Sequence, residues 1–171
     1  MFNFNKFKEF MMMNMNIPHT SKYHKESFID HVMMMVDEAF SSGNRPLIIA
    51  TMLHDIGKPD CHIERPGKGN TFYNHEKVGE EMVKLFLTED DHDYKQVCFM
   101  VRNHMVPFQA NGPEPWASYA QKQLIQFITE NDPMWISNLF HLHKLDIQAS
   151  KRDNWYNDKS YIDLFDTFYI D

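Results

Sequence analysis

The 171-residue sequence is poor in the residues that interrupt regular structure and in those that cross-link a chain. Its six glycines and eight prolines favour regular elements joined by short loops. Its two cysteines, Cys61 and Cys98, form no Cys-x-x-Cys pair, which excludes a disulfide scaffold and indicates a reducing compartment. No apolar run approaches the length of a membrane span, so we expect no contact with a membrane.

Positive charge is also scarce, since the formal net charge is −7. We therefore expect no extended nucleic-acid surface, although a locally basic pocket for a small phosphate compound is compatible with this charge. The first residues lack the basic-then-apolar order of a secretion signal, which predicts a cytoplasmic protein. The aromatic and Met-rich N-terminus suggests self-association as a homo-oligomer.

Apolar residues recur at helical spacing along nearly the whole chain, and they make up 43% of it. This pattern predicts an all-α fold, a single compact domain over residues 1–171 with roughly six to eight helices. The predicted helices cover residues 4–17, 20–43, 46–56, 75–88, 91–104, 116–131, 133–151 and 154–171. Residues 59–74 are the least regular part, with a short extended piece expected at 71–73.

One ionisable residue lies on the apolar face of each of five predicted helices. These residues are His31, His54, His75, His104 and Asp146. A single histidine of this kind is readily explained as a core residue with a hydrogen-bond partner. Five are harder to explain in this way, because burying one unpaired polar group costs roughly 2–7 kcal/mol. A shared divalent cation is the simplest compensation, since it favours both neutral imidazole and ionised carboxylate.

The order of His31, His54-Asp55 and Asp146 resembles the H…HD…D signature of the HD-domain superfamily of metal-dependent phosphohydrolases. Residues 53–59, 72–79 and 101–105 also resemble the HD domain attached to bacterial CCA-adding tRNA nucleotidyltransferases. The resemblance covers roughly residues 20–150, so we expect an HD core there with short helical extensions at both ends. The sequence shows no Gly-Ser followed by an Asp-x-Asp pair, and nucleotide addition to tRNA is therefore not implied.

The resemblance implies a first metal held by His31, His54, Asp55 and Asp146. His75 and His104 match the extra histidines of HD proteins that bind a second metal, with Asp55 as the bridge. The two histidines could instead contact phosphate or protonate the leaving oxygen. A mixed nitrogen and oxygen ligand set suits Mn, Fe, Mg, Co, Ni or Zn, as one ion or two.

Three basic residues are candidates for binding the substrate. Lys58, one turn beyond His54, could bind a phosphate oxygen or orient a carboxylate, or it could be a solvated lysine at a helix end. His24 lies two helical turns before His31 and would line the pocket mouth, unless it is a surface histidine. Arg102 points away from His104 on an ideal helix and reaches the substrate only if the helix end is distorted.

Three functions are consistent with this pattern. The first is an enzyme with Asp55, Lys58, His75 and His104 in catalysis, acting on a nucleotide or related phosphate ester as a nucleotidase, dNTP triphosphohydrolase or phosphodiesterase. The stand-alone length is closest to small HD nucleotidases and to the dNTP triphosphohydrolases of some bacteriophages. The second is a metal and nucleotide sensor without turnover. The third is a helical interaction module whose histidines only pack.

Overall fold

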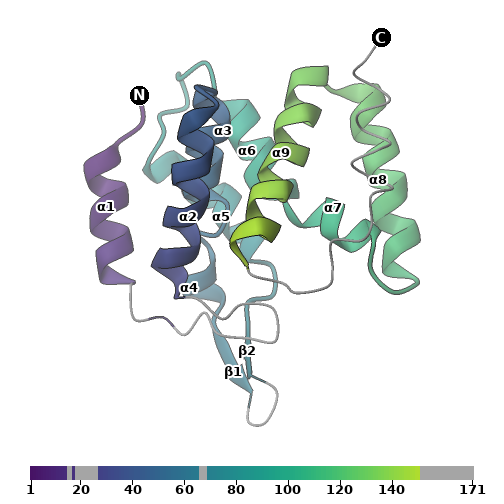
Figure 1. Cartoon of the computed structure of the whole chain (residues 1–171), viewed down its shortest axis with the longest axis horizontal. Helices are drawn as coiled ribbons and strands as arrows, with labels where there is room; N and C mark the ends of the chain where they lie inside the picture. Colours follow the sequence, from purple (N-terminus) through teal and green to yellow (C-terminus); the bar gives the residue numbers. More distant parts are fainter. Residues whose placement is uncertain (15–16, 18–26, 66–68, 151–171) are drawn as a thin grey trace.

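The computed structural model describes residues 1–14, 17, 27–65 and 69–150. The helices are α1 (Phe4–Met13), α2 (Phe28–Ser41), α3 (Arg45–Leu53), α4 (Lys58–Cys61), α5 (His75–Met82), α6 (Tyr94–Asn103), α7 (Met105–Ala110), α8 (Trp116–Glu130) and α9 (Pro133–Ala149), with the 3₁₀ helix η1 (Val83–Leu85) after α5. A two-stranded antiparallel sheet joins β1 (Ile63–Arg65) to β2 (Gly69–Thr71). The all-α prediction is confirmed (Figure 1).

Several helices begin where a short polar side chain accepts a backbone hydrogen bond. Ser27 accepts from the N–H of Asp30 at the start of α2, and Asp132 accepts from the N–H of Met134 at the start of α9. Asn44 caps α3, and Pro46 lies in its first turn as predicted. The predicted start of the second helix near residue 20 is wrong, since α2 begins at Phe28. The predicted helix over 154–171 lies outside the described residues.

The main core lies where α2, α3, α6 and α9 pack against one another. Helix α3 is the central element, because nearly all of its side chains from Leu47 to Leu53 are buried. A helix that is apolar on all sides is stable only when neighbours surround it. Figure 1 shows α2 and α9 beside it, with α6 behind. This position carries the residues that follow Leu53 into the interior of the domain.

A second, smaller core joins α7 to α8. It contains the buried side chains of Val106, Ala110, Ala120 and Leu124. Helix α7 was not predicted from the sequence. Pro107 explains why it is separate from α6, because a proline ring clashes with the carbonyl four residues before it and breaks a continuous helix. The break falls at His104.

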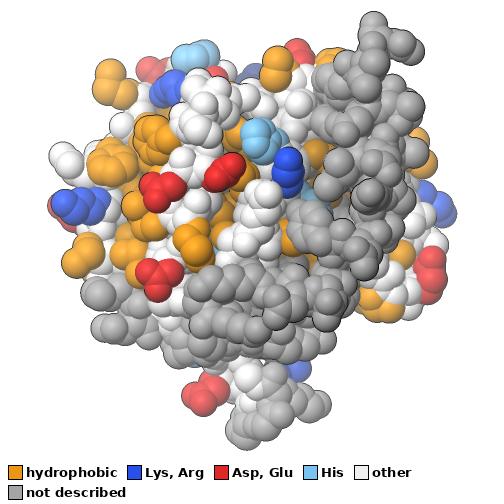
Figure 2. Space-filling view, in the orientation of Figure 1, with side chains coloured by type: hydrophobic (Ala, Val, Ile, Leu, Met, Phe, Trp, Pro, Cys, Tyr) orange, Lys and Arg blue, Asp and Glu red, His pale blue; other side chains and the backbone are white. Residues whose placement is uncertain are grey.

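Helices α1 and α2 expose several large apolar side chains, which are visible on the left of Figure 2. They are Phe4, Met12, Met13, Met33, Met34 and Phe40. The two runs of three methionines, at residues 11–13 and 33–35, also contribute one buried side chain each to the core, Met11 and Met35. Self-association stays a prediction. In the described part of the chain, no helix combines the length and hydropathy that crossing a membrane requires.

A turn of four residues, His54 to Gly57, separates α3 from α4, and it packs directly on the first turn of α5. A Cβ atom at Gly57 would lie 2.2 Å from the carbonyl oxygen of His75 and 2.7 Å from the backbone nitrogen of Gly79. A Cβ atom at Gly79 would lie 3.2 Å from Cγ1 of Val101. Only glycine allows this approach, which brings the turn against the helix that begins with His75.

Substituting Gly57→Ala should destabilise the protein by about 3 kcal/mol or more, because both obstacles are backbone atoms that cannot rotate away. Gly43→Ala is the matched control, since its Cβ would meet nothing within 4 Å and its φ of +63° costs only about 1 kcal/mol. Urea unfolding followed by circular dichroism compares the two. Equal losses of stability would contradict the close approach at Gly57.

Candidate metal centre

Six ionisable side chains predicted from the sequence converge at one end of the core. They come from α2 (His31), the turn after α3 (His54 and Asp55), the start of α5 (His75), the junction of α6 and α7 (His104) and α9 (Asp146). All six are buried, and none is more than 8% exposed when the whole residue is considered. Two sets of three among them bring ligand atoms within 4.8 Å of one another.

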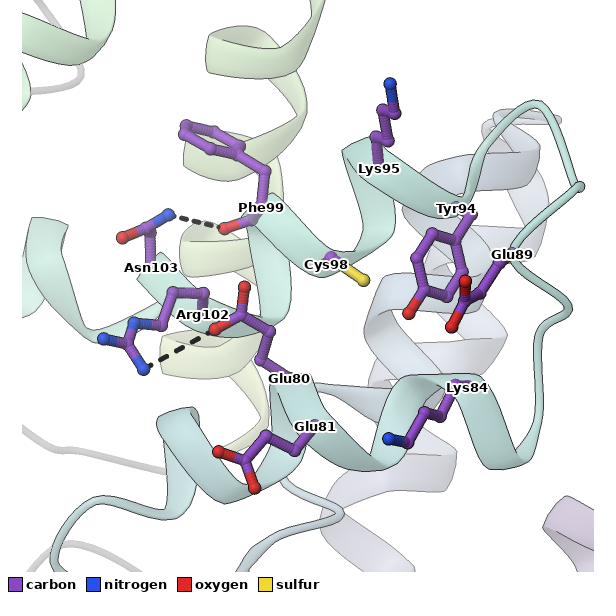
Figure 3. Close-up of a pocket in the computed structure, with 10 residues that line it drawn as sticks. All are labelled: Glu80, Glu81, Lys84, Glu89, Tyr94, Lys95, Cys98, Phe99, Arg102 and Asn103. Atoms are coloured by element: carbon purple, nitrogen blue, oxygen red, sulfur yellow. Dashed lines mark hydrogen bonds and ion pairs between the residues drawn. The ribbon is translucent and has the colours of Figure 1, made fainter.

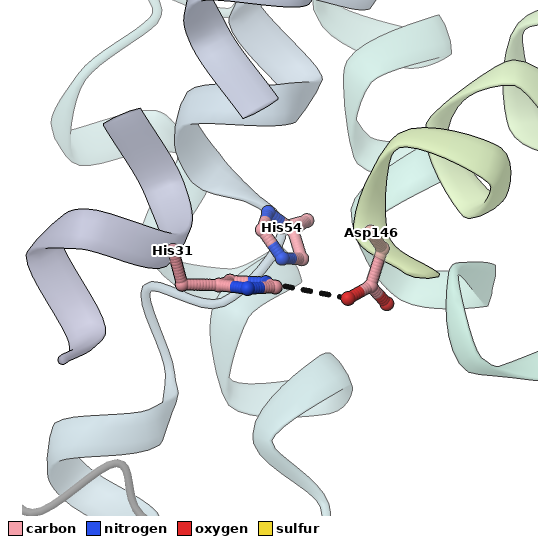
Figure 4. Close-up of side chains that lie close together, drawn as sticks. All are labelled: His31, His54 and Asp146. Atoms are coloured by element: carbon pink, nitrogen blue, oxygen red, sulfur yellow. Dashed lines mark ion pairs between the residues drawn. The ribbon is translucent and has the colours of Figure 1, made fainter. Parts of the chain in front are cut away.

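The first set of three consists of His31, His54 and Asp146. Figure 4 shows the two imidazoles and the carboxylate pointing toward one another from α2, the end of α3 and α9. Nε2 of His31 lies 3.3 Å from Oδ1 of Asp146. We call this set the first donor group. Its two imidazoles and one carboxylate are the ligand types that first-row transition metals bind.

The second set of three consists of Asp55, His75 and His104, which we call the second donor group. Asp55 also faces the first donor group, because its two oxygens lie near different histidines. Oδ1 is 3.2 Å from Nε2 of His75 and 3.7 Å from Nε2 of His104. Oδ2 is 3.2 Å from Nε2 of His54 and 3.8 Å from Nε2 of His31. A carboxylate in this position can serve both groups at once.

Backbone carbonyls set the orientation of three of the imidazoles. The Nδ1 atom of each ring lies within hydrogen-bond distance of the carbonyl oxygen three residues earlier: 2.9 Å for His54 and Thr51, 2.7 Å for His75 and Phe72, and 2.8 Å for His104 and Val101. A carbonyl only accepts, so Nδ1 carries the proton and donates it. In the neutral ring, Nε2 then presents a lone pair to the centre. Metal-binding histidines have this arrangement.

The lone pairs of His75 and His104 point at each other across 3.1 Å between their Nε2 atoms. Two lone pairs at this distance repel unless a proton or a cation lies between or beside them. Nε2 of His54 is also buried and makes no hydrogen bond, although Asp55 is close. The donor set therefore fits a bound cation, which would be held by the Nε2 atoms and the two carboxylates.

The charge states that the site favours are those of a metal-binding set. Burial, together with the nearby imidazoles of His75 and His54, lowers the pKa of His104 to about 3 and keeps it neutral. Burial alone would raise the pKa of Asp55, but the neighbouring His54 and Lys58 hold it well below its usual value. Burial of Asp146 is likewise outweighed by its contact with His31, which lowers the pKa. Neutral imidazole and ionised carboxylate are the forms that ligate metals.

Lys58 is buried against the centre and is not a solvated lysine at a helix end. It is 5% exposed, and its Nζ lies 2.6 Å from Oδ2 of Asp55. The sequence suggested a pairing with a carboxylate as one of three alternatives, and the structure has that pairing. Phe72, which was not predicted to be a site residue, contacts Lys58 through its ring and His75 through its carbonyl.

Arg102 lies away from these six side chains. Its guanidinium is 3.5 Å from Oε2 of Glu80, and it lines a surface hollow of about 500 Å³ on the outer side of α5 and α6 (Figure 3). None of the six convergent residues lines this hollow. The candidate metal centre is therefore identified by its donor atoms and lies apart from the hollow. No contact of Arg102 supports its predicted role with the substrate. His24 lies outside the described residues.

A third group that could hold a metal, Asp91, His92 and Asp93, has a different explanation. The guanidinium of Arg45 pairs with both carboxylates, and one of these contacts is a 2.7 Å ion pair with Asp91. This pairing lowers the pKa of Asp91 and compensates part of the negative charge of the group without a metal. His92 is 81% exposed at its side chain. This acidic turn is therefore structural, since it ties the start of α3 to the loop before α6.

The profile of the HD domain family matches residues 28–138, which is more than half of the chain. The chain belongs to the HD domain family. The match includes every convergent residue except Asp146, which lies eight residues beyond its end. The chain is also similar to the A-adding tRNA nucleotidyltransferase of Deinococcus radiodurans, with 36% identity over 66 residues. That segment covers 36% of this chain and 15% of the relative.

Adding Mn²⁺ to the chelator-treated HD domain should raise its thermal unfolding temperature. Binding stabilises the folded state by about 2.7 kcal/mol when free metal is 100 times Kd. For a chain of this length the increase is about 5–10 °C. Differential scanning calorimetry measures it, and excess EDTA is the control. An unchanged unfolding temperature at millimolar Mn²⁺ would contradict a metal centre.

Proposed function

We propose that this HD domain is a divalent-metal-dependent phosphohydrolase that acts on a nucleotide or a related phosphate ester. The observation that carries the proposal is the position of Asp55, whose two oxygens face two different donor groups. A carboxylate shared in this way, with imidazole nitrogens on each side, is suited to two cations a few Å apart. Pairs of cations at such spacing are used in phosphate ester hydrolysis.

The convergent residues would have the following roles in this reaction. His31, His54, Asp55 and Asp146 would hold the first ion, and Asp55, His75 and His104 would hold the second. Bound divalent metal lowers the pKa of water toward neutrality and neutralises phosphate charge. Lys58 would supply a further positive charge for a phosphate oxygen. Burial of the whole set excludes bulk water and strengthens each of these electrostatic interactions.

The accessibility of the site favours a small phosphate compound over a polymer. The side chains of His75 and Asp146 are the most accessible of the six, at 9% and 12% exposure, so a phosphate would enter between them. Such low exposure favours a terminal or single phosphate. The net charge of −7 also disfavours a long polyanion. We therefore propose a nucleotide, and not a nucleic acid, as the partner.

The variant Asp55→Ala should lose at least about a thousandfold in turnover, because it removes the carboxylate common to both donor groups. Nucleoside mono- and triphosphates, dinucleotides and 2′,3′-cyclic nucleotides with Mn²⁺, Mg²⁺, Fe²⁺, Co²⁺, Ni²⁺ or Zn²⁺ are the substrates to test, with products read by mass spectrometry. Asp37→Ala, an exposed carboxylate on α2, is the control and should stay active. Full activity of Asp55→Ala would contradict the hydrolase proposal. Binding of metal and nucleotide without turnover in the natural protein would favour a sensor.

The number of ions can be tested separately from turnover. We expect two Mn²⁺ per chain by equilibrium dialysis and one in His75→Ala, since this change leaves the first donor group intact. The exposed His92→Ala is the matched control and should bind the same number as the natural chain. Circular dichroism verifies that each variant is folded. A single ion in the natural chain would restrict His75 and His104 to contacts with phosphate or the leaving group.

A further inference from the structure

Lys58 is a buried lysine whose ammonium pairs with an oxygen of a candidate ligand, Asp55. It begins α4, three residues after Asp55, and its Nζ lies 2.6 Å from Asp55 Oδ2. Its side chain is 7% exposed and that of Asp55 is 3% exposed. Taking an ammonium and a carboxylate out of water costs several kcal/mol each, which close pairing repays in part. In the protein without metal, Lys58 is therefore the counter-charge of Asp55.

The oxygen that Lys58 contacts is also the one that faces the first donor group. Oδ2 lies 3.2 Å from Nε2 of His54 and 3.8 Å from Nε2 of His31. A divalent ion bound by these nitrogens would attract Oδ2 and repel the ammonium beside it. Both effects are strong where water is excluded. The ion and the ammonium therefore compete for one oxygen.

Phe72 gives the ammonium a second neighbour. Nζ of Lys58 lies 5.6 Å from the centroid of the Phe72 ring, within the range of a cation–π interaction. The ring packs in turn against the imidazole of His62, with 5.5 Å between their centroids. His62 is held by the side chain of Asn70, whose Oδ1 lies 2.9 Å from its Nε2. The ammonium can thus leave Oδ2 and stay beside the ring of Phe72, which follows β2 directly.

We propose that Lys58 is a displaceable counter-cation. It holds Asp55 in the metal-free protein, yields Oδ2 when a divalent ion binds, and then binds a phosphate oxygen of the substrate from its place beside Phe72. The last of these steps rests on the function proposed above. Binding of the metal would then release the ammonium of Lys58 from Asp55 and make it available to a phosphate in the same step. Lys58 opposes metal binding, and this distinguishes it from a residue that only orients a ligand.

The test is the Mn²⁺ affinity of Lys58→Met, measured by isothermal titration calorimetry on the full chain. We expect the affinity to rise about tenfold, because the competing charge is gone. In EDTA the variant should unfold at a lower temperature than the natural protein, and Mn²⁺ should raise that temperature more. Lys77→Met, an exposed lysine on α5, removes the same charge near the site and should change the affinity less than about twofold.

If Lys58 merely orients Asp55, the Mn²⁺ affinity should change in the opposite direction, since loss of an orienting residue lowers metal affinity by about 10- to 100-fold. A lowered or unchanged affinity in Lys58→Met would therefore overturn the proposal. Lys58→Gln is uncharged and can still donate to Oδ2. It replaces Lys58→Met in the test if that variant does not fold, and its Mn²⁺ affinity should also rise. Metal affinity is measured without turnover, so this proposal and the hydrolase function fail separately. At saturating Mn²⁺, Lys58→Met should release phosphate about 100-fold more slowly, and an unchanged rate would overturn the step that involves the substrate.

Discussion

The buried carboxylate of Asp55 is the group on which the rest of the site depends. Four imidazole nitrogens and one ammonium lie within 4 Å of its oxygens, at distances of 3.8, 3.2, 3.2, 3.7 and 2.6 Å. A carboxylate on a side chain that is only 3% exposed would otherwise carry an unpaired charge in the interior. Each of the helices that meet at this point contributes a side chain from its end or its inner face. The charge at Asp55 thus links the packing of the domain to its chemistry.

Close packing of the backbone holds the two donor groups at their separation. The turn that carries His54 and Asp55 contacts the first turn of α5 through Gly57 and Gly79, where side chains would not fit. Carbonyls near the ends of helices fix the rings of His54, His75 and His104 in one tautomer. Because the orienting groups belong to the backbone, most side-chain substitutions nearby leave the rings in place.

Hydrophobic periodicity was sufficient to predict the all-α fold and the inward position of five of the six convergent residues, whereas Asp55 was identified through the resemblance to HD domains. It failed where the periodic signal is short or interrupted. The strands have three residues each, too few for an alternation, and Pro107 splits a pattern that otherwise continues past His104. The start of α2 is decided by the cap at Ser27, while the apolar spacing alone gave no boundary.

The site could be predicted as a list of residues but not as an arrangement. Side-chain spacing indicates which face of a helix a histidine shares, but it says nothing of which carbonyl accepts its Nδ1 proton. The burial of Lys58 depends on the turn between α3 and α4, whereas the helix was expected to continue to Ile56. The pairing of Arg102 with Glu80 depends on how α5 and α6 pack together, which is tertiary information.

Anomalous diffraction from crystals grown with Mn²⁺ tests the central claim most directly. We predict two manganese peaks flanking the carboxylate of Asp55, one beside His31, His54 and Asp146 and the other beside His75 and His104. Manganese absent from both positions, or found only at Asp91 and Asp93, would contradict the assignment of Asp55 as the shared ligand of a metal centre.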